Sequence, residues 1–186
     1  MSKINDDPNK FKISIILGFI EHISIIGLTI MLFIVFNQYN VILGIIWTIF
    51  RTGEALIYIY NEIKYWELLN ISRQYSITSG AEKESVSILG RNLLQSKFRR
   101  YTLAMILFSV GTLAYSILFI TNELGNVIPP FIGWIGIFAS VSFGLGNILR
   151  FVKANYEGLA IMAIGGLLVI LFESIIGVWL LFYGRT

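Results

Sequence analysis

Residues 41–66, VILGIIWTIFRTGEALIYIYNEIKYW, are long enough to cross a bilayer as one helix, yet they carry charged residues near their centre. A hydrocarbon core of about 30 Å needs about 20 apolar residues in a helix. At helical spacing, Arg51 and Glu54 share one face with Tyr58 and Asn61, and we call these four residues the polar stripe. Because charged groups near mid-membrane avoid lipid, the polar stripe should face protein or water.

The rest of the chain is unusually apolar. Of its 186 residues, 56% are hydrophobic and only 13% are charged, and the mean hydropathy is +0.76. Soluble domains are about 45–50% apolar and about 25% charged, so this composition predicts an integral protein of the lipid bilayer. We predict an all-α bundle of five transmembrane helices forming one domain over residues 11–185, after a polar cytoplasmic lead at residues 1–10. The predicted spans are 11–36, 41–66, 101–120, 129–152 and 158–183.

The distribution of basic residues predicts the orientation of the bundle. With five spans, the N-terminus lies on the same side as the segments after the second and fourth spans, and that side carries twelve of the fourteen Lys and Arg residues. The opposite side carries only Arg185. Basic loops stay in the cytoplasm, so we expect the N-terminus inside and the C-terminus outside the cell membrane. The basic excess is then a topology signal and does not predict binding to nucleic acid.

The longest segment outside the predicted spans is residues 70–97. Ser79 and Glu82 have the spacing of a capping box, and apolar residues follow at helical spacing from Val86. We therefore expect a short amphipathic helix that connects the second and third spans on the cytoplasmic surface.

The last two spans combine small residues with single polar ones. Gly136, Ser140 and Gly144 recur every four residues, a pattern that lets helices pack closely. Asn147 lies on the same face. Glu173 is expected toward the outer leaflet by its position along the last span, so we predict that it lies apart from the polar stripe. It is either a second polar site, with Asn147, Thr112 or Ser116 as a partner, or a hydrogen-bonded packing residue.

The first span adds Glu21 and His22. Because the first two spans form an antiparallel hairpin, Glu21 lies at nearly the depth of Arg51, and a cluster of Glu21, Arg51 and Glu54 is expected. The ring of His22 projects about 100° away from Glu21. Zinc sites normally combine three or four His, Cys or carboxylate ligands, and the chain has one His and no Cys, so we assign no metal site.

Two functions remain open for this intramembrane cluster. In the first, it lines a cavity open to the cytoplasm, where carboxylates bind a cation or proton and Arg51 binds an anionic group, as in a small transport or ligand-sensing protein. In the second, it is an ion-paired brace in a non-catalytic accessory or scaffold subunit, a homo-oligomer or part of a complex, which docks another helix on its small residues. An enzyme acting on a lipid is a third alternative, but no catalytic residue or cofactor motif can be named.

Three groups of residues resemble one family of prokaryotic membrane proteins, the domain of unknown function 4386. They are FRTGEA at 50–55, FSVGT at 108–112 followed by Pro130 ahead of a Gly-rich helix, and FE at 172–173 followed by WLL at 179–181 and YG at 183–184. The resemblance covers about residues 11–185. It implies the same helical architecture and matches Arg51, Glu54 and Glu173 to polar positions of the family, and it implies no activity.

Overall fold

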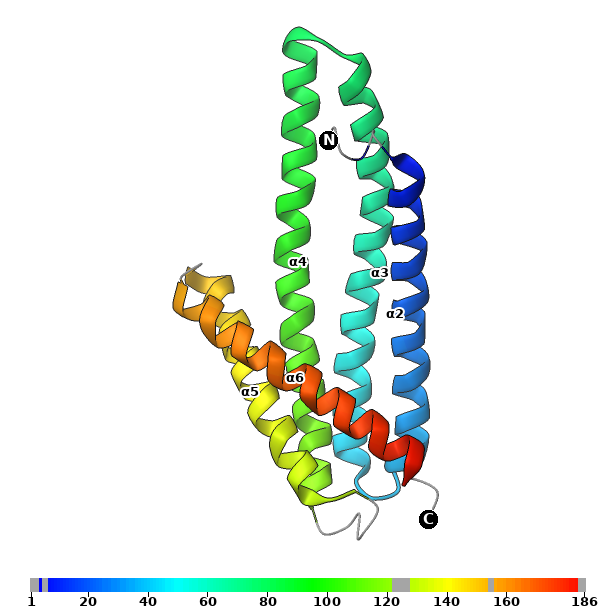
Figure 1. Cartoon of the computed structure of the whole chain (residues 1–186), viewed down its shortest axis with the longest axis vertical. Helices are drawn as coiled ribbons and strands as arrows, with labels where there is room; N and C mark the ends of the chain where they lie inside the picture. Colours follow the sequence, from blue (N-terminus) through cyan, green and yellow to red (C-terminus); the bar gives the residue numbers. More distant parts are fainter. Residues whose placement is uncertain (1–3, 5–6, 122–127, 154–155, 184–186) are drawn as a thin grey trace.

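The protein is built from long helices (Figure 1). The structure is a computed structural model that describes residues 4, 7–121, 128–153 and 156–183. Its helices are α2 (Pro8–Phe36), α3 (Val41–Ile77), α4 (Gly80–Ile120), α5 (Pro130–Lys153) and α6 (Tyr156–Phe182). Within the described residues there is no strand, and all five helices are long and apolar enough to cross a membrane. The predicted all-α architecture with five spans is confirmed.

Side chains cap the starts of the first two long helices. The Asp7 carboxylate accepts a hydrogen bond from the backbone N–H of Lys10 at 3.0 Å, and Pro8 opens α2. Asn40 Oδ1 accepts from the backbone N–H of Leu43 at 3.1 Å at the start of α3. These bonds satisfy N–H groups that the first turn of a helix leaves unpaired. The short turn between Phe36 and Val41 joins α2 and α3 as an antiparallel hairpin (Figure 1).

Helices α3 and α4 are longer than a bilayer requires. With 37 and 41 residues at 1.5 Å each, they extend about 55 and 60 Å, against about 30 Å for a hydrocarbon core. The two helices run antiparallel and meet in a turn at residues 78–79 (Figure 1). The connector at 70–97 is therefore not the separate short helix that was expected, because its residues are divided between the end of α3 and the start of α4.

The residues before and within this turn explain why α3 continues so far and where the chain reverses. No Gly or Pro interrupts residues 54–79, so α3 continues beyond its apolar part. Ser79 takes the N-cap position of α4 with an extended backbone, but its side chain makes no capping hydrogen bond. Gly80 has φ of 59°, a left-handed conformation that glycine adopts without a steric penalty, and the chain reverses there.

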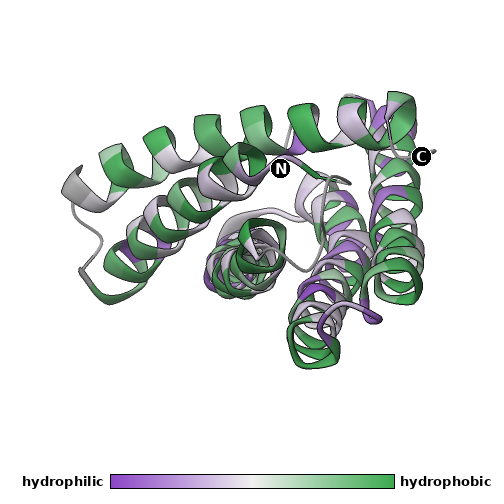
Figure 2. Cartoon of the chain, turned by 90° about the horizontal axis from the view of Figure 1, so that it is seen from below, coloured by the Kyte–Doolittle hydropathy of each residue, from purple (hydrophilic) through white to green (hydrophobic). Residues whose placement is uncertain are grey.

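Each helix packs on its neighbours in the sequence. Within the described residues, no α-carbon of α6 lies within 8 Å of one in α2, α3 or α4, although α6 packs closely on α5. Helix α6 instead crosses obliquely over α4 and α3 toward the end of α2 (Figure 1), and the end-on view in Figure 2 shows it bridging the bundle. Side chains, rather than close backbone contact, therefore connect α6 to the first three helices.

A cluster of aromatic rings connects α3, α4 and α6. The centroids of the Trp47 and Tyr115 rings, on α3 and α4, are 4.1 Å apart, and those of the Phe119 and Phe172 rings, on α4 and α6, are 6.5 Å apart. These residues belong to a buried cluster that also contains Phe36, Leu118, Ile128 and Ile132. A smaller cluster joins α4, α5 and α6 through Phe108, Ala139 and Val169.

Helix α5 uses small residues to approach α4. A β-carbon on Gly136 would lie 2.2 Å from Ser116 Oγ, and one on Gly144 would lie 3.0 Å from the β-carbon of Ser109. Between them, Ser140 is 2% exposed and donates its hydroxyl to the Gly136 carbonyl at 2.6 Å. The face made of Gly136, Ser140 and Gly144 thus lies against α4 of the same chain.

Candidate functional site

A cavity of about 1150 Å³ lies between α2, α3, α4 and α6. All four residues of the polar stripe line it, while most of the other lining side chains are apolar. Small-molecule pockets in proteins usually measure about 300–1,000 Å³, so this space is large enough for a ligand. It exists because α6 meets the first three helices only through large side chains. The polar stripe therefore faces the interior of the protein, as expected from its charges.

Arg51 and Glu54 form a buried ion pair on the cavity wall. Arg51 Nη1 donates to Glu54 Oε2 at 2.8 Å, and the two residues are 5% and 2% exposed. The guanidinium carbon lies 5.2 Å from the Trp47 ring centroid and 4.6 Å from that of Phe108. Gly111 leaves room for the arginine, because a β-carbon there would lie 3.0 Å from Arg51 Cγ. Since both charges belong to α3, this pair does not join α3 to α2.

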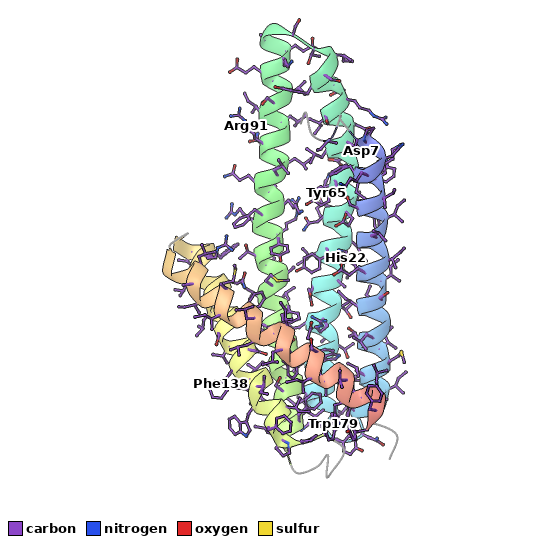
Figure 3. The ribbon with its side chains drawn as sticks, in the orientation of Figure 1. Asp7, His22, Tyr65, Arg91, Phe138 and Trp179 are labelled. Carbon is purple, nitrogen blue, oxygen red and sulfur yellow. The ribbon has the colours of Figure 1, made fainter. Side chains whose placement is uncertain are left out.

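His22 makes the polar contact between α2 and α3, and Figure 3 labels it on α2 beside α3. Its ring stacks on Tyr58 with centroids 4.8 Å apart, and its Nε2 lies 3.7 Å from Glu62 Oε1. His22 is 7% exposed. Gly18 makes space for this contact, because a β-carbon on it would lie 2.8 Å from Glu62 Cδ.

Glu21 does not join Arg51 as the depth of the two residues predicted. Its side chain is exposed, and none of the three ion pairs between described residues includes it. Successive helical residues point about 100° apart, so only one of Glu21 and His22 can face α3, and that residue is His22. Glu21 still lines the cavity from α2.

Asn61 connects the polar stripe to α4. Its Oδ1 accepts a hydrogen bond from Arg100 Nε at 2.7 Å, and Asn61 is 2% exposed. Lys97 Nζ lies 3.7 Å from the Tyr65 ring centroid, and Lys97 and Glu62 both line the cavity. We call the part of the cavity at Glu62 and Lys97 the charged end.

Five buried polar atoms in the described part of the chain have no hydrogen-bond partner. They are His22 Nδ1, Trp47 Nε1, Arg51 Nε, Asn61 Nδ2 and Tyr115 Oη. All five residues line the cavity, and each is at most 7% exposed. Leaving a buried polar group unpaired costs about 1–3 kcal/mol, and such groups usually find a partner in water or a ligand. These atoms could therefore bind a molecule in the cavity.

Glu173 lines the same cavity as Arg51 and Glu54, so it does not form the separate position that was expected. Asn147 is not among the lining residues. It is 1% exposed, and its Nδ2 donates to the Phe143 carbonyl of its own helix at 2.8 Å. The prediction failed because α6 is strongly tilted (Figure 1), so counting 1.5 Å per residue overstates the depth of Glu173.

Three aromatic residues at this site were not predicted. Trp47 lies four residues before Arg51, and this helical spacing was a signal that both side chains share a face. Tyr115 and Phe108 come from α4. The hydroxyl residues Ser109 and Ser116 mark a face of α4 that lies against Gly144 and Gly136 of α5, so they did not indicate that the two aromatic residues face the cavity. No three His, Cys, Asp or Glu side chains of the described residues come together to hold a metal ion.

Comparison with known proteins identifies the family. No curated protein and no solved structure matches the chain. A family model described as Domain of unknown function (DUF4386) matches residues 1–184, a range that includes all five helices and every residue lining the cavity. As its motifs predicted, the chain belongs to the DUF4386 family.

Proposed function

We propose that this protein is a small membrane transport or ligand-sensing protein that binds its ligand in the cavity between α2, α3, α4 and α6. The observation that supports this proposal most directly is the position of the five unpartnered polar atoms, all of which belong to residues of one cavity wall. Buried polar groups usually find a partner in the protein, in water or in a ligand, so groups that find none within the protein suit a hydrated cavity that binds a ligand.

The composition of the wall suits a small molecule. Hydrocarbon and aromatic side chains form most of it, with a few polar groups along the polar stripe, at Glu173 and at the charged end. Arg51 and Asn61 offer donors, and the carboxylates of Glu54 and Glu173 offer acceptors. A mostly apolar pocket with a few convergent polar groups is typical of ligand-binding sites.

The alternative role is a non-catalytic accessory or scaffold subunit. It depends on a small-residue face that can dock another helix and on an ion pair that braces two helices. The face of Gly136, Ser140 and Gly144 lies against α4, so it is not free to dock another helix. The Arg51–Glu54 pair lies within α3 and does not brace two helices. These contacts favour the ligand-binding role.

We further propose that the charged end of the cavity faces the cytoplasm of a prokaryotic cell. Basic residues of α4 and α5 lie together at this level of the bundle. The Arg99 guanidinium is 5.8 Å from the Phe151 ring, and that of Arg150 is 5.0 Å from the Phe98 ring. A belt of Arg and Lys is typical of the cytoplasmic interface, which supports an N-terminus inside the cell.

Cysteine accessibility tests whether water reaches the cavity. The chain has no cysteine, so single substitutions can be labelled without background. Ile25→Cys and Met105→Cys place thiols on the α2 and α4 walls and leave the polar groups unchanged. We expect a hydrophilic maleimide to label both variants in inside-out vesicles, because a hydrated cavity allows the reactive thiolate to form.

Two control variants make the result decisive. Leu56→Cys lies on α3 outside the cavity, where the native residue is 56% exposed on the outer surface, and it should stay unlabelled in lipid. Ser85→Cys, in the part of α4 near the turn, should be labelled rapidly. If Ile25→Cys and Met105→Cys behave like Leu56→Cys while Ser85→Cys reacts, the hydrated cavity and the transport or sensing role are refuted.

A further inference from the structure

We propose that the cavity binds an uncharged amphiphile, whose oxygen-bearing head accepts hydrogen bonds from Trp47, Arg51 and Tyr115 and whose hydrocarbon tail lies between α2 and α6. This inference rests on the proposed function, because it names the class of ligand that the cavity would bind. Monoacylglycerols, with ester and hydroxyl oxygens on one acyl chain, are a simple example of this class.

The head group is inferred from three unpartnered donors that lie close together. The Trp47 and Tyr115 rings are 4.1 Å apart, and the Arg51 guanidinium carbon is 5.2 Å from the Trp47 ring. The free atoms are the indole Nε1, the guanidinium Nε and the phenol Oη. An indole N–H and a guanidinium N–H can only donate, so the missing partner must carry acceptor oxygens or nitrogens.

The charges nearby select against a charged head. Arg51 is already paired with Glu54 at 2.8 Å, and Glu21 and Glu173 line the same cavity. An anionic head beside Arg51 would therefore compete with the Glu54 carboxylate, in a cavity whose wall holds two further carboxylates. A cationic ammonium head cannot accept hydrogen bonds from the cluster of donors, and it would be held beside the positive charge of Arg51. An uncharged head with acceptor oxygens avoids both conflicts.

The tail is inferred from an apolar opening toward the membrane. Leu17 and Leu28 of α2 line the cavity and are 59% and 48% exposed. Leu167 and Ile170 of α6 also line it and are 70% and 65% exposed. Side chains that belong both to a cavity wall and to the outer surface mark an opening. Here the side chains on both edges of the opening, from α2 and from α6, are hydrocarbon. In a bilayer an acyl chain can therefore lie in it without losing its apolar surroundings.

Fluorescence quenching of Trp47 by brominated tails tests this inference. The chain has four Trp residues, so changing Trp66, Trp134 and Trp179 to Phe leaves Trp47 as the only reporter. The protein is reconstituted in phosphatidylcholine vesicles with one of three probes that share a dibrominated C18 tail: a monoacylglycerol, an alkyl sulfate or an alkyltrimethylammonium. We expect the monoacylglycerol to quench at a mole fraction about tenfold lower than either charged probe, the effect of one or two selective hydrogen bonds.

Matched tyrosine variants separate the head from the tail. Tyr115→Phe removes one proposed donor and keeps the ring, and it should weaken quenching by the monoacylglycerol about fivefold while leaving the charged probes unchanged. Tyr39→Phe removes a hydroxyl from a residue that packs on the same aromatic cluster but does not line the cavity, and it should have no effect.

The outcomes distinguish this inference from the proposed function. Equal quenching by all three probes, a preference for a charged probe, or no effect of Tyr115→Phe would overturn the uncharged amphiphile. If Ile25→Cys and Met105→Cys are still labelled in that case, the hydrated cavity stands and its ligand belongs to another class. Selective quenching that is lost in Tyr115→Phe and kept in Tyr39→Phe would support the inference.

Discussion

Gly146 of α5 lies directly against the backbone of Met162 in α6. A β-carbon on Gly146 would be 2.4 Å from the Met162 backbone nitrogen, and one on Gly165 of α6 would be 2.4 Å from the Phe143 backbone nitrogen. Each helix thus has a glycine at the point where the backbone of the other helix comes closest. This contact holds α6 on α5 and so positions the helix that closes the cavity.

We predict that Gly146→Ala destabilises the protein by about 1–3 kcal/mol, the usual cost of overpacking, because the new methyl group meets backbone that cannot rotate away. Thermal unfolding in detergent, followed by size-exclusion chromatography, measures the effect. Gly27→Ala is the matched control, since a β-carbon on Gly27 has nothing within 4 Å. Equal unfolding temperatures for the two variants would show that α5 and α6 do not approach as closely as described.

The Arg51–Glu54 pair should respond differently to single and double substitution. Glu54→Leu leaves the buried Arg51 charge without its 2.8 Å partner and should cost about 3–5 kcal/mol. The double variant Arg51→Leu, Glu54→Leu removes both charges and should recover most of that loss, because buried ion pairs are often replaceable by apolar residues. Unfolding temperatures of both variants test this.

The same double variant separates a ligand site from a structural pair. A stable double variant that no longer shows selective quenching by the uncharged probe would assign the pair to ligand binding. A double variant that is less stable than Glu54→Leu would instead mean that the pair is needed for folding.

The sequence predicted the helices well because hydrophobic length and helical spacing are local properties. It also predicted the polar stripe, since Arg51 and Glu54 have few alternatives to facing inward. What it missed depends on the rotation and tilt of helices. Either Glu21 or His22 could have faced α3, and the tilt of α6 that brings Glu173 to the same cavity as Arg51 leaves no trace in the residues of α6. Tyr115 reaches the site through the packing of α4, whose Ser109 and Ser116 mark the face toward α5 and gave no indication of the face toward the cavity.

Asn61 and Arg100 should be energetically coupled. Their 2.7 Å hydrogen bond is a polar link between α3 and α4 on the cavity wall, and replacing Asn61 with Leu leaves Arg100 Nε without its acceptor. A double-mutant cycle of Asn61→Leu and Arg100→Leu should give a coupling of about 0.5–3 kcal/mol. The exposed Lys64–Glu67 pair within α3 provides the control cycle and should show little coupling, because solvent screens it. A similar result for both pairs would contradict a structural role for Asn61.

The turns at the two ends of α3 should lie on opposite sides of the membrane. Gln38 is an exposed residue of the turn between α2 and α3, and Ser85 is an exposed residue near the turn between α3 and α4. The excess of Lys and Arg near the second turn predicts that it is cytoplasmic. An impermeant maleimide should therefore label Gln38→Cys in intact cells and Ser85→Cys only in inside-out vesicles. The reverse pattern would place the charged end of the cavity outside the cell, so that a ligand entering there would come from the exterior.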